Sequence, residues 1–329
     1  MLLVSKIYRG SVVESFHIGY ATAVNEKGEI LFQAGDSDYP VYILDSAKPF
    51  QIIPLLEEGG VDKFHFSDEE VAVMCSTHNG ENQHVGLVSD ILKKLDLGID
   101  DLHCGTQPPL DKVSYEQMIL KGRRATPVYN SSSGTHVAML ALSKALDVSP
   151  VNYELENHPV QKRIFEKMKH YSATDKIPIA KDDSGLPTFF LPMVSLAQMY
   201  STLAQGADDY LQKIFHIMSL HPKTIAGKSR FDTDFLSTMS GKGVAKMGSD
   251  GLRTIGIRAE EGKYVGIAIK VLSNHHQALD SMSIAVMQHL RLLDEETATK
   301  LDGYRQPKTY GTNDVEIGHV QTEIVVDEK

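Results

Sequence analysis

Four short polar segments of the sequence carry side chains that could perform acid–base or nucleophilic chemistry. They are Asp45-Ser46-Ala47-Lys48, Thr77-His78-Asn79-Gly80-Glu81, Asn130-Ser131-Ser132-Ser133-Gly134-Thr135-His136 and Asp182-Asp183-Ser184-Gly185. A hydroxyl beside a lysine can act as an activated nucleophile, and a hydroxyl at a helix start lies near N–H groups that could stabilise an oxyanion. Each segment alone is equally typical of helix caps and turns. Together they favour an enzyme.

The first segment is close to an S-x-x-K pair, in which hydroxyl and ammonium lie one helical turn apart. Ser46 and Lys48 are two residues apart, so they would point to different sides of a helix. Asp45 and Lys48 stand at i and i+3 and would share a face, which predicts that they pair. This spacing argues against Ser46 as a nucleophile of the β-lactamase type.

Lys270 is a further candidate, because it interrupts the apolar run Val265–Val271. A lysine in a buried strand needs a polar partner, which favours a functional role. At the tip of an exposed strand it would simply extend into solvent. His78 and His136, taken singly, are more typical of ordinary core or surface histidines than of ligands.

The composition excludes several classes of protein. The 329 residues carry a formal net charge of −10 and no basic run, which argues against a nucleic acid or an anionic membrane as partner. No apolar run approaches the roughly 20 residues of a membrane span, and the N-terminal residues do not resemble a signal peptide. Cys75 and Cys104 are too few for a disulfide framework and match no zinc spacing. We therefore expect a cytoplasmic protein.

Helices between strands at both ends of the chain must position these segments. Hairpins are predicted around the turn Asn25–Gly28 and within Leu252–Leu272, with the second turn at Glu260–Lys263. The expected helices include Pro49–Glu58, which Pro54 could bend, Asn82–Leu97 and Thr135–Leu146, while Glu69–Cys75 fits a strand or a buried helical turn. This order predicts an α+β fold in a single domain, residues 1–329. A mixed sheet would come from about residues 1–45 and 250–329, and a helical subdomain from about 46–249.

Seven segments follow one another in a recognisable order. They are Arg9–His17 (RGSVVESFH), SAKPFQ, Cys75–His84 (CSTHNGENQH), SSSGTHVAML, NHPVQKRI, SGLPTFFLP and VGIAIKV. In this order, and nearly end to end, the chain resembles the bacterial L-asparaginase II family of the Rhizobium etli inducible type. The resemblance implies a fold similar to serine β-lactamases, penicillin-binding proteins and glutaminases, and a homodimer. It also implies hydrolysis of L-asparagine to L-aspartate and ammonia.

The resemblance assigns catalytic positions that this sequence fills differently. The first serine of the family falls on Asp45 and its lysine on Lys48. A second serine falls on Thr77, and the lysine that accompanies it falls on Lys270. These four residues are the predicted catalytic set, with Thr77 retaining a hydroxyl that a neutral lysine could activate.

The family member with a known metal site binds zinc through Cys, Lys and Cys, and those positions are Ser132, Thr135 and Ser184 here. Hydroxyls are poor zinc ligands, so we expect no metal and no other cofactor. The family histidine is retained as His136 and an aspartate as Asp182. The predicted substrate-binding residues are Ser46, His78, Asn79, Asn130, Ser132, Ser133, Gly134, His136, Asp182 and Ser184.

The first hypothesis is therefore an amidohydrolase that acts on L-asparagine or a close amide, a small-molecule substrate. The alternative is a non-catalytic amino-acid-binding protein that kept the fold without the family serine and zinc ligands. The presence of Thr77 with two lysines favours hydrolysis, because binding alone would not require both lysines. A serine acyltransferase with Ser46 as nucleophile is the third reading.

Overall fold

A computed structural model describes residues 1–260 and 262–326 of the chain. Residue contacts divide the chain into two compact units. The sheet unit comprises Met1–Ser46, Leu191–Gln205 and Asp234–Lys329, and the helical unit comprises Ala47–Phe190 and Gly206–Thr233. The prediction of one domain over residues 1–329 stays a prediction, and residues 327–329 lie outside the described part.

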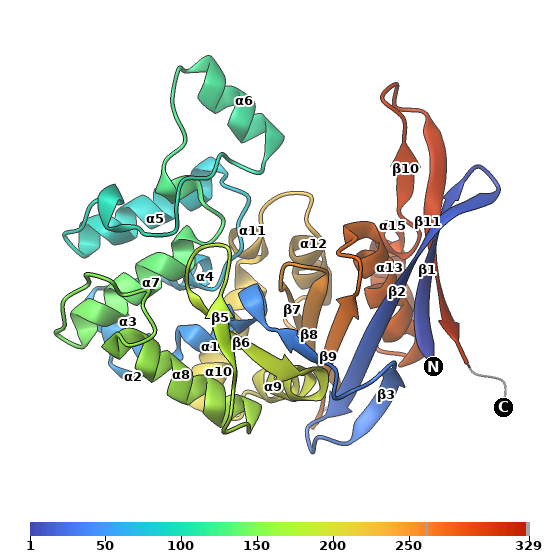
Figure 1. Ribbon diagram of the computed structural model, residues 1–329, viewed down its shortest axis with the longest axis horizontal. Helices are drawn as coiled ribbons and strands as arrows, with labels where there is room; N and C mark the ends of the chain where they lie inside the picture. Colours follow the sequence, from blue (N-terminus) through green and yellow to red (C-terminus); the bar gives the residue numbers. More distant parts are fainter. Residues whose placement is uncertain (261, 327–329) are drawn as a thin grey trace. The chain divides into compact units, whose positions relative to one another are not determined.

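An antiparallel sheet dominates the sheet unit. Among the described residues its strands run in the order β10-β11-β1-β2-β9-β8-β7, with β3 also paired to β2 (Figure 1). The strands are β1 (Leu2–Arg9), β2 (Val12–Asn25), β3 (Ile30–Ala34), β7 (Gly243–Met247), β8 (Leu252–Glu260), β9 (Lys263–Val271), β10 (Lys308–Tyr310) and β11 (Glu316–Val325). Because β1 pairs with both β2 and β11, the two ends of the chain meet in one sheet.

Helices α9 (Met193–Gln205) and α13 (His276–His289) cover opposite faces of this sheet. A Cβ at Gly266 of β9 would lie 1.8 Å from the carbonyl oxygen of Ala197 in α9. A Cβ at Gly19 of β2 would lie 2.3 Å from Sδ of Met282 in α13. Gly19 is paired with Val271, five residues along β9 from Gly266, and an odd spacing puts the two glycines on opposite faces.

The remaining elements of the sheet unit are short. They are β4 (Pro40–Tyr42), η1 (Leu44–Ala47, shared with the helical unit at Ala47), α12 (Phe231–Met239, mostly in this unit), α14 (Glu295–Lys300) and α15 (Asp302–Arg305). Helix η1 leads directly into the first helix of the helical unit, so the segment Asp45–Lys48 supplies residues to both units.

The helical unit packs helices around α7. Its elements are α1 (Lys48–Gln51), α2 (Ile53–Glu57), α3 (Gly60–Lys63), α4 (Asp68–Met74), α5 (Asn82–Lys94), η2 (Ile99–Asp101), α6 (Lys112–Leu120), η3 (Pro127–Tyr129), α7 (Ser133–Ala145), α8 (Pro159–Ser172), β5 (Ile179–Lys181), β6 (Pro187–Pro192, mostly in this unit), α10 (Asp209–Leu220) and α11 (Pro222–Ile225). Figure 1 shows α2, α3, α7 and α8 together, with α6 extending away from them. Residues Val137–Leu142 of α7 are all buried.

Helix α4 begins with a capping box, in which Ser67 accepts from the backbone of Glu70 and Glu70 accepts from the backbone of Ser67. The sequence left Glu69–Cys75 open as a strand or a buried helical turn. The segment is helical as far as Met74, and the capping box is the local feature that favours the helix. Helix α7 crosses α4 so closely that a Cβ at Gly134 would lie 1.9 Å from the carbonyl oxygen of Val73. Because residue 134 is glycine, the C-terminal end of α4 can contact the N-terminal end of α7. These two ends carry the polar segments that contain Thr77 and Ser132.

The predicted α+β fold class, with a sheet from both termini and a helical part, is confirmed. The first predicted hairpin forms, because β2 pairs with β3 across Asn25–Gly28. The expected helix Pro49–Glu58 is divided into α1 and α2, with Pro54 in the first turn of α2. The second hairpin pairs β8 with β9, and Glu261 of its turn lies outside the described residues.

Two elements from the range 46–249, which was expected to form the helical subdomain, belong to the sheet unit. Strand β7 extends the sheet beyond β8, although Lys246 interrupts its apolar pattern. Helix α9 packs on β8 and β9 and not in the helical unit. No helix in the described ranges combines the length and the apolar character of a membrane span.

Candidate active site

Lys48 is the centre of a buried polar cluster in the helical unit. Its side chain is 2% exposed. Its Nζ donates to the carbonyl oxygen of Ser76 at 2.9 Å, to Thr77 Oγ1 at 3.1 Å and to Ser132 Oγ at 3.1 Å. A lysine, a threonine and a serine from three different polar segments thus share one hydrogen-bonded group.

The loop after α4 presents Thr77 to this group. The backbone N–H of Thr77 donates to the carbonyl oxygen of Ile225 at 3.0 Å, and that of His78 donates to Ser131 at 3.2 Å. These bonds tie the loop to α11 on one side and to the start of α7 on the other. Thr77 keeps 7% of its surface exposed.

Asn130 shapes the turn that places Ser132. Its Oδ1 accepts from the backbone N–H of Ser132 at 2.8 Å, and its Nδ2 donates to the carbonyl oxygen of Cys104 at 2.8 Å. An asparagine that bonds the backbone two residues later forms an Asx turn. The predicted binding residue Asn130 therefore orients the loop directly before α7.

His78 and Ser133 form a chain of hydrogen bonds with one consistent direction. The backbone N–H of Gly80 donates to His78 Nδ1 at 3.2 Å, so the proton of a neutral ring is on Nε2. Nε2 donates to Ser133 Oγ at 3.0 Å, and Ser133 Oγ donates to the carbonyl oxygen of Val128 at 3.1 Å. Both side chains are completely buried, which suits a role in holding the loop.

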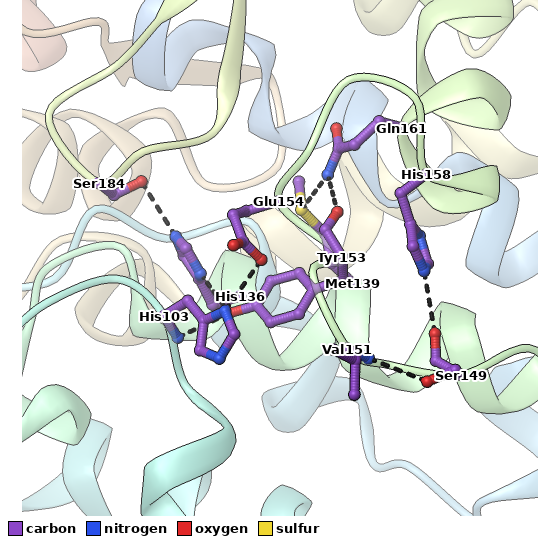
Figure 2. Close-up of polar contacts among 10 residues, drawn as sticks. All are labelled: His103, His136, Met139, Ser149, Val151, Tyr153, Glu154, His158, Gln161 and Ser184. Atoms are coloured by element: carbon purple, nitrogen blue, oxygen red, sulfur yellow. Dashed lines mark hydrogen bonds and ion pairs between the residues drawn. The ribbon is translucent and has the colours of Figure 1, made fainter.

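His136 belongs to a second chain of hydrogen bonds, and Figure 2 shows its bonds to Ser184 and Tyr153. Ser184 Oγ donates to Asp182 Oδ1 at 2.8 Å, so it accepts from His136 Nε2 at 3.0 Å. His136 Nδ1 then accepts from the hydroxyl of Tyr153 at 2.6 Å. The backbone N–H of His103 donates to the same hydroxyl oxygen at 2.9 Å.

The surroundings keep the His136 ring neutral. Burial, together with smaller contributions from the charges of Lys48 and His103, lowers its pKa to about 3. The neutral ring agrees with the hydrogen-bond directions, because Nδ1 has to accept from Tyr153. His136 is therefore a fixed donor to Ser184, which in turn donates to Asp182.

Asn79 and Cys104 border this region without joining the Lys48 group. The carbonyl oxygen of Asn79 accepts from the backbone of Asp111 at 2.9 Å, and its side chain packs against Gly227. The thiol of Cys104 donates to Pro127, and burial raises its pKa to about 12. Cys104 is thus a protonated, unreactive thiol at ordinary pH.

Three predicted site residues belong to the sheet unit. Asp45 accepts from Ser249 Oγ at 2.5 Å, and Ser46 Oγ accepts from Thr254 Oγ1 at 2.9 Å. The ammonium of Lys270 donates to the carbonyl oxygen of Asp250, and burial lowers its pKa. The pairing of Asp45 with Lys48, and the convergence of Lys270 on Thr77, stay predictions.

The three zinc positions implied by the resemblance do not fit zinc. Ser132 Oγ accepts from the Lys48 ammonium, Thr135 Oγ1 donates to the carbonyl oxygen of Met74 at 3.3 Å, and Ser184 bonds Asp182. Neutral hydroxyls committed in this way cannot replace thiolate or imidazole ligands. Across residues 1–260 and 262–326, no group of three His, Cys, Asp or Glu side chains could hold a metal ion.

Tyr153 is the site residue that the sequence analysis missed. It lies in the polar loop between α7 and α8 and is completely buried. It contacts His103 and His136 with its ring and bonds His136 with its hydroxyl. An aromatic residue inside a polar, proline-flanked loop is the signal that could have identified it.

A sequence model of the family described as L-asparaginase II matches residues 5–322. The chain therefore belongs to the L-asparaginase II family. No curated protein sequence matches the chain.

Solved structures of a protein named Mglu also match. Its native form in the presence of 4.3 M NaCl is 11% identical, with a TM-score of 0.38 over 85% of this chain and 62% of that chain. Its L-glutamate binding form in the same salt is 12% identical, with a TM-score of 0.39 over 88% of this chain and 64% of that chain. The chain spans less than two thirds of the length of these two structures.

Proposed function

We propose that the chain hydrolyses L-asparagine, or a closely related amide, to the corresponding acid and ammonia. Thr77 is the nucleophile and Lys48 its base. The hydrogen bond of 3.1 Å between Lys48 Nζ and Thr77 Oγ1 carries the proposal, because a nucleophile within hydrogen-bond reach of a base is the signature of an activated hydroxyl. Family membership supports the reaction class.

In the proposed reaction, the Lys48 ammonium first releases a proton to solvent. Its neutral amine then takes the Thr77 proton while Oγ1 attacks the amide carbon. Lys48 then returns this proton to the departing nitrogen, the C–N bond breaks and ammonia leaves. Water attacks the resulting ester with Lys48 again as base, which releases the acid and restores Thr77. Ser132 shares the amine with Thr77 and holds it in position.

The decisive experiment compares two identical substitutions within one unit. Thr77→Val removes the proposed nucleophile and should lower ammonia release by at least about 10³-fold, because essential nucleophiles contribute several decades of rate. Thr135→Val, whose hydroxyl bonds only the backbone of Met74 among the described contacts, is the matched control and should retain most activity. Ser46→Ala should also retain most activity.

The outcomes separate the alternatives. Full activity in Thr77→Val would disprove the assigned nucleophile, and loss in Ser46→Ala alone would support the serine acyltransferase. If the unaltered protein binds amino acids but releases no ammonia from any small amide, the chain is a binding protein. The ratio of kcat/KM for asparagine and glutamine ranks these substrates, since one methylene is worth about 1–3 kcal/mol.

We further propose that the active form is a cytoplasmic homodimer. Strand β2 exposes Val12 and Phe16 by 68% and 67%, and exposed apolar residues of this kind are typical of surfaces that a partner covers. Sedimentation should give twice the chain mass of 36.4 kDa, and cell fractionation should recover the protein with cytoplasmic markers. A monomer at all concentrations would contradict the assembly.

A further inference from the structure

Apart from the Lys48 group, the helical unit contains a cavity with the character of a ligand site. Its volume is about 830 Å³, and its lining contains neither Lys48 nor Thr77 nor Ser132. Small-molecule sites commonly measure roughly 300–1,000 Å³ and combine apolar walls with a few polar groups. Its apolar wall comes from the loop before α8, from α8, from β5 and the segment before it, and from β6. The residues are Leu155, Phe165, Ile177, Ile179, Pro187 and Phe189.

Charged groups of both signs border this apolar wall. Lys162 and Lys181 supply two ammonium groups, and Glu156 supplies a carboxylate. All three side chains are exposed, and within the described part of the chain none of them takes part in an ion pair. The cavity therefore offers free positive and negative charge beside an apolar surface.

Gln161 adds a buried acceptor to the same lining. Its side chain is 3% exposed, and its Nε2 donates to the carbonyl oxygen of Tyr153 at 2.9 Å and to Met139 Sδ at 3.1 Å. Its Oε1 is buried without a hydrogen-bond partner among the described residues, and Figure 2 shows it directed away from both acceptors of Nε2. Buried acceptors are rarely left without a donor, so rotation of the Gln161 amide toward the cavity would give this oxygen a partner in a ligand N–H group.

We propose that this cavity binds a free L-amino acid with an apolar side chain. The ligand carboxylate pairs with Lys162 and Lys181, and its ammonium group meets Glu156 and Gln161 Oε1. Its side chain packs against the apolar wall. A zwitterion satisfies all of these groups at once, whereas an apolar acid or an apolar amine would leave one charge set without a partner.

Calorimetric titration of the full chain with L-phenylalanine tests this proposal without reference to amide hydrolysis. We expect one site per chain. The double substitution Lys162→Met and Lys181→Met should raise Kd at least ~10-fold, the effect of about 1.4 kcal/mol. Lys213→Met, an exposed lysine of α10 outside this lining, is the matched control and should leave Kd unchanged.

Two analogues of L-phenylalanine test the contributions of its ammonium group and its carboxylate to binding separately. 3-Phenylpropionate lacks the ammonium group and 2-phenylethylamine lacks the carboxylate, so each should bind at least ~10-fold more weakly than L-phenylalanine. Equal binding of either analogue would overturn the zwitterion assignment. Absence of binding at millimolar ligand, or an unchanged Kd in a double variant with wild-type circular dichroism, would overturn the site.

Competition distinguishes this cavity from the active site. L-Aspartate, the product of the proposed reaction, should not displace L-phenylalanine, and Thr77→Val should bind it with unchanged Kd. Displacement by L-aspartate would place the ligand in the active site and refute a second site. Because the readout is binding, a failure of the proposed hydrolysis would leave this result intact.

Discussion

The first turn of α7 is where the polar side chains of the helical unit converge. Ser132 contacts Lys48, Ser133 contacts His78, and His136 contacts Ser184. Ser132 and His136 stand at i and i+4, so the helix places them on one face. The two chains of hydrogen bonds have fixed directions because each ends on a backbone oxygen or a carboxylate. The neutral His136 ring therefore fixes the donor and acceptor at each bond from Tyr153 through Ser184 to Asp182.

We predict that His136 makes the stability of the fold dependent on pH. Burial lowers its pKa to about 3 in the folded state, against 6.5 for an exposed histidine. Below about pH 6.5 the unfolded chain binds a proton that the folded chain does not, so stability is lost as the pH falls. The slope is about 1.4 kcal/mol per pH unit between the two pKa values. Urea unfolding from pH 7.5 to 4.5 measures it.

The variant His136→Gln isolates this contribution, since glutamine keeps hydrogen-bonding groups but does not titrate. The slope of its unfolding free energy against pH should be smaller than that of the unaltered protein. The difference should correspond to the uptake of about one proton on unfolding. Equal slopes for the two proteins would contradict the neutral, buried ring. Tyr153→Phe removes the donor to Nδ1 and should raise the pKa of His136, which NMR titration of the ring detects.

At the scale of elements, the crossing of α4 and α7 brings Thr77 to Ser132. The crossing is possible because Gly134 has no side chain where it meets the carbonyl of Val73. Thr135 reinforces the same contact through its bond to Met74. Gly134 thus acts on the site through packing, although the sequence analysis had assigned it to substrate binding, a role that stays a prediction.

We predict that Gly134→Ala destabilises the protein by about 2–4 kcal/mol and abolishes ammonia release. The added Cβ would lie 1.9 Å from a backbone oxygen, so the two helices have to separate. Gly86 in α5 has no atom within 4 Å of its Cβ position and supplies the control. Gly86→Ala should stabilise the protein by about 0.5–1 kcal/mol. If the two variants shifted the unfolding midpoint of the unaltered protein in the same direction and by a similar amount, this packing would be contradicted.

At the scale of the whole molecule, one segment supplies residues to two compact units. Asp45 and Ser46 form hydrogen bonds within the sheet unit, and Lys48 is the centre of the cluster in the helical unit. The sheet unit is assembled from both ends of the chain and the helical unit from the middle.

We predict that ammonia release is independent of metal ions. The hydroxyls of Ser132, Thr135 and Ser184 already have hydrogen-bond partners, and the Lys48 ammonium would repel a cation beside Ser132. Treatment with EDTA should leave the rate unchanged, and elemental analysis should find far less than one zinc per chain. About one zinc per chain, together with loss of activity on chelation, would contradict the prediction.

The sequence by itself determined the fold class, the family and the polar segments of the candidate site. Periodicity is a local property, so it predicted α5, α7 and the hairpin at Asn25–Gly28. It left Glu69–Cys75 undecided, because a short apolar run fits either element. Spacing also showed that Ser46 is out of register with Lys48.

Only the tertiary structure decided which side chains meet. Lys48, Thr77 and Ser132 are far apart in the chain, and no periodicity links them. Tyr153 lies in a loop without any motif, yet its hydroxyl donates to Nδ1 of His136. Hydrogen-bond direction, burial and the lowered pKa of His136 arise from neighbours distant in sequence, and such contacts exist only once the helices have packed.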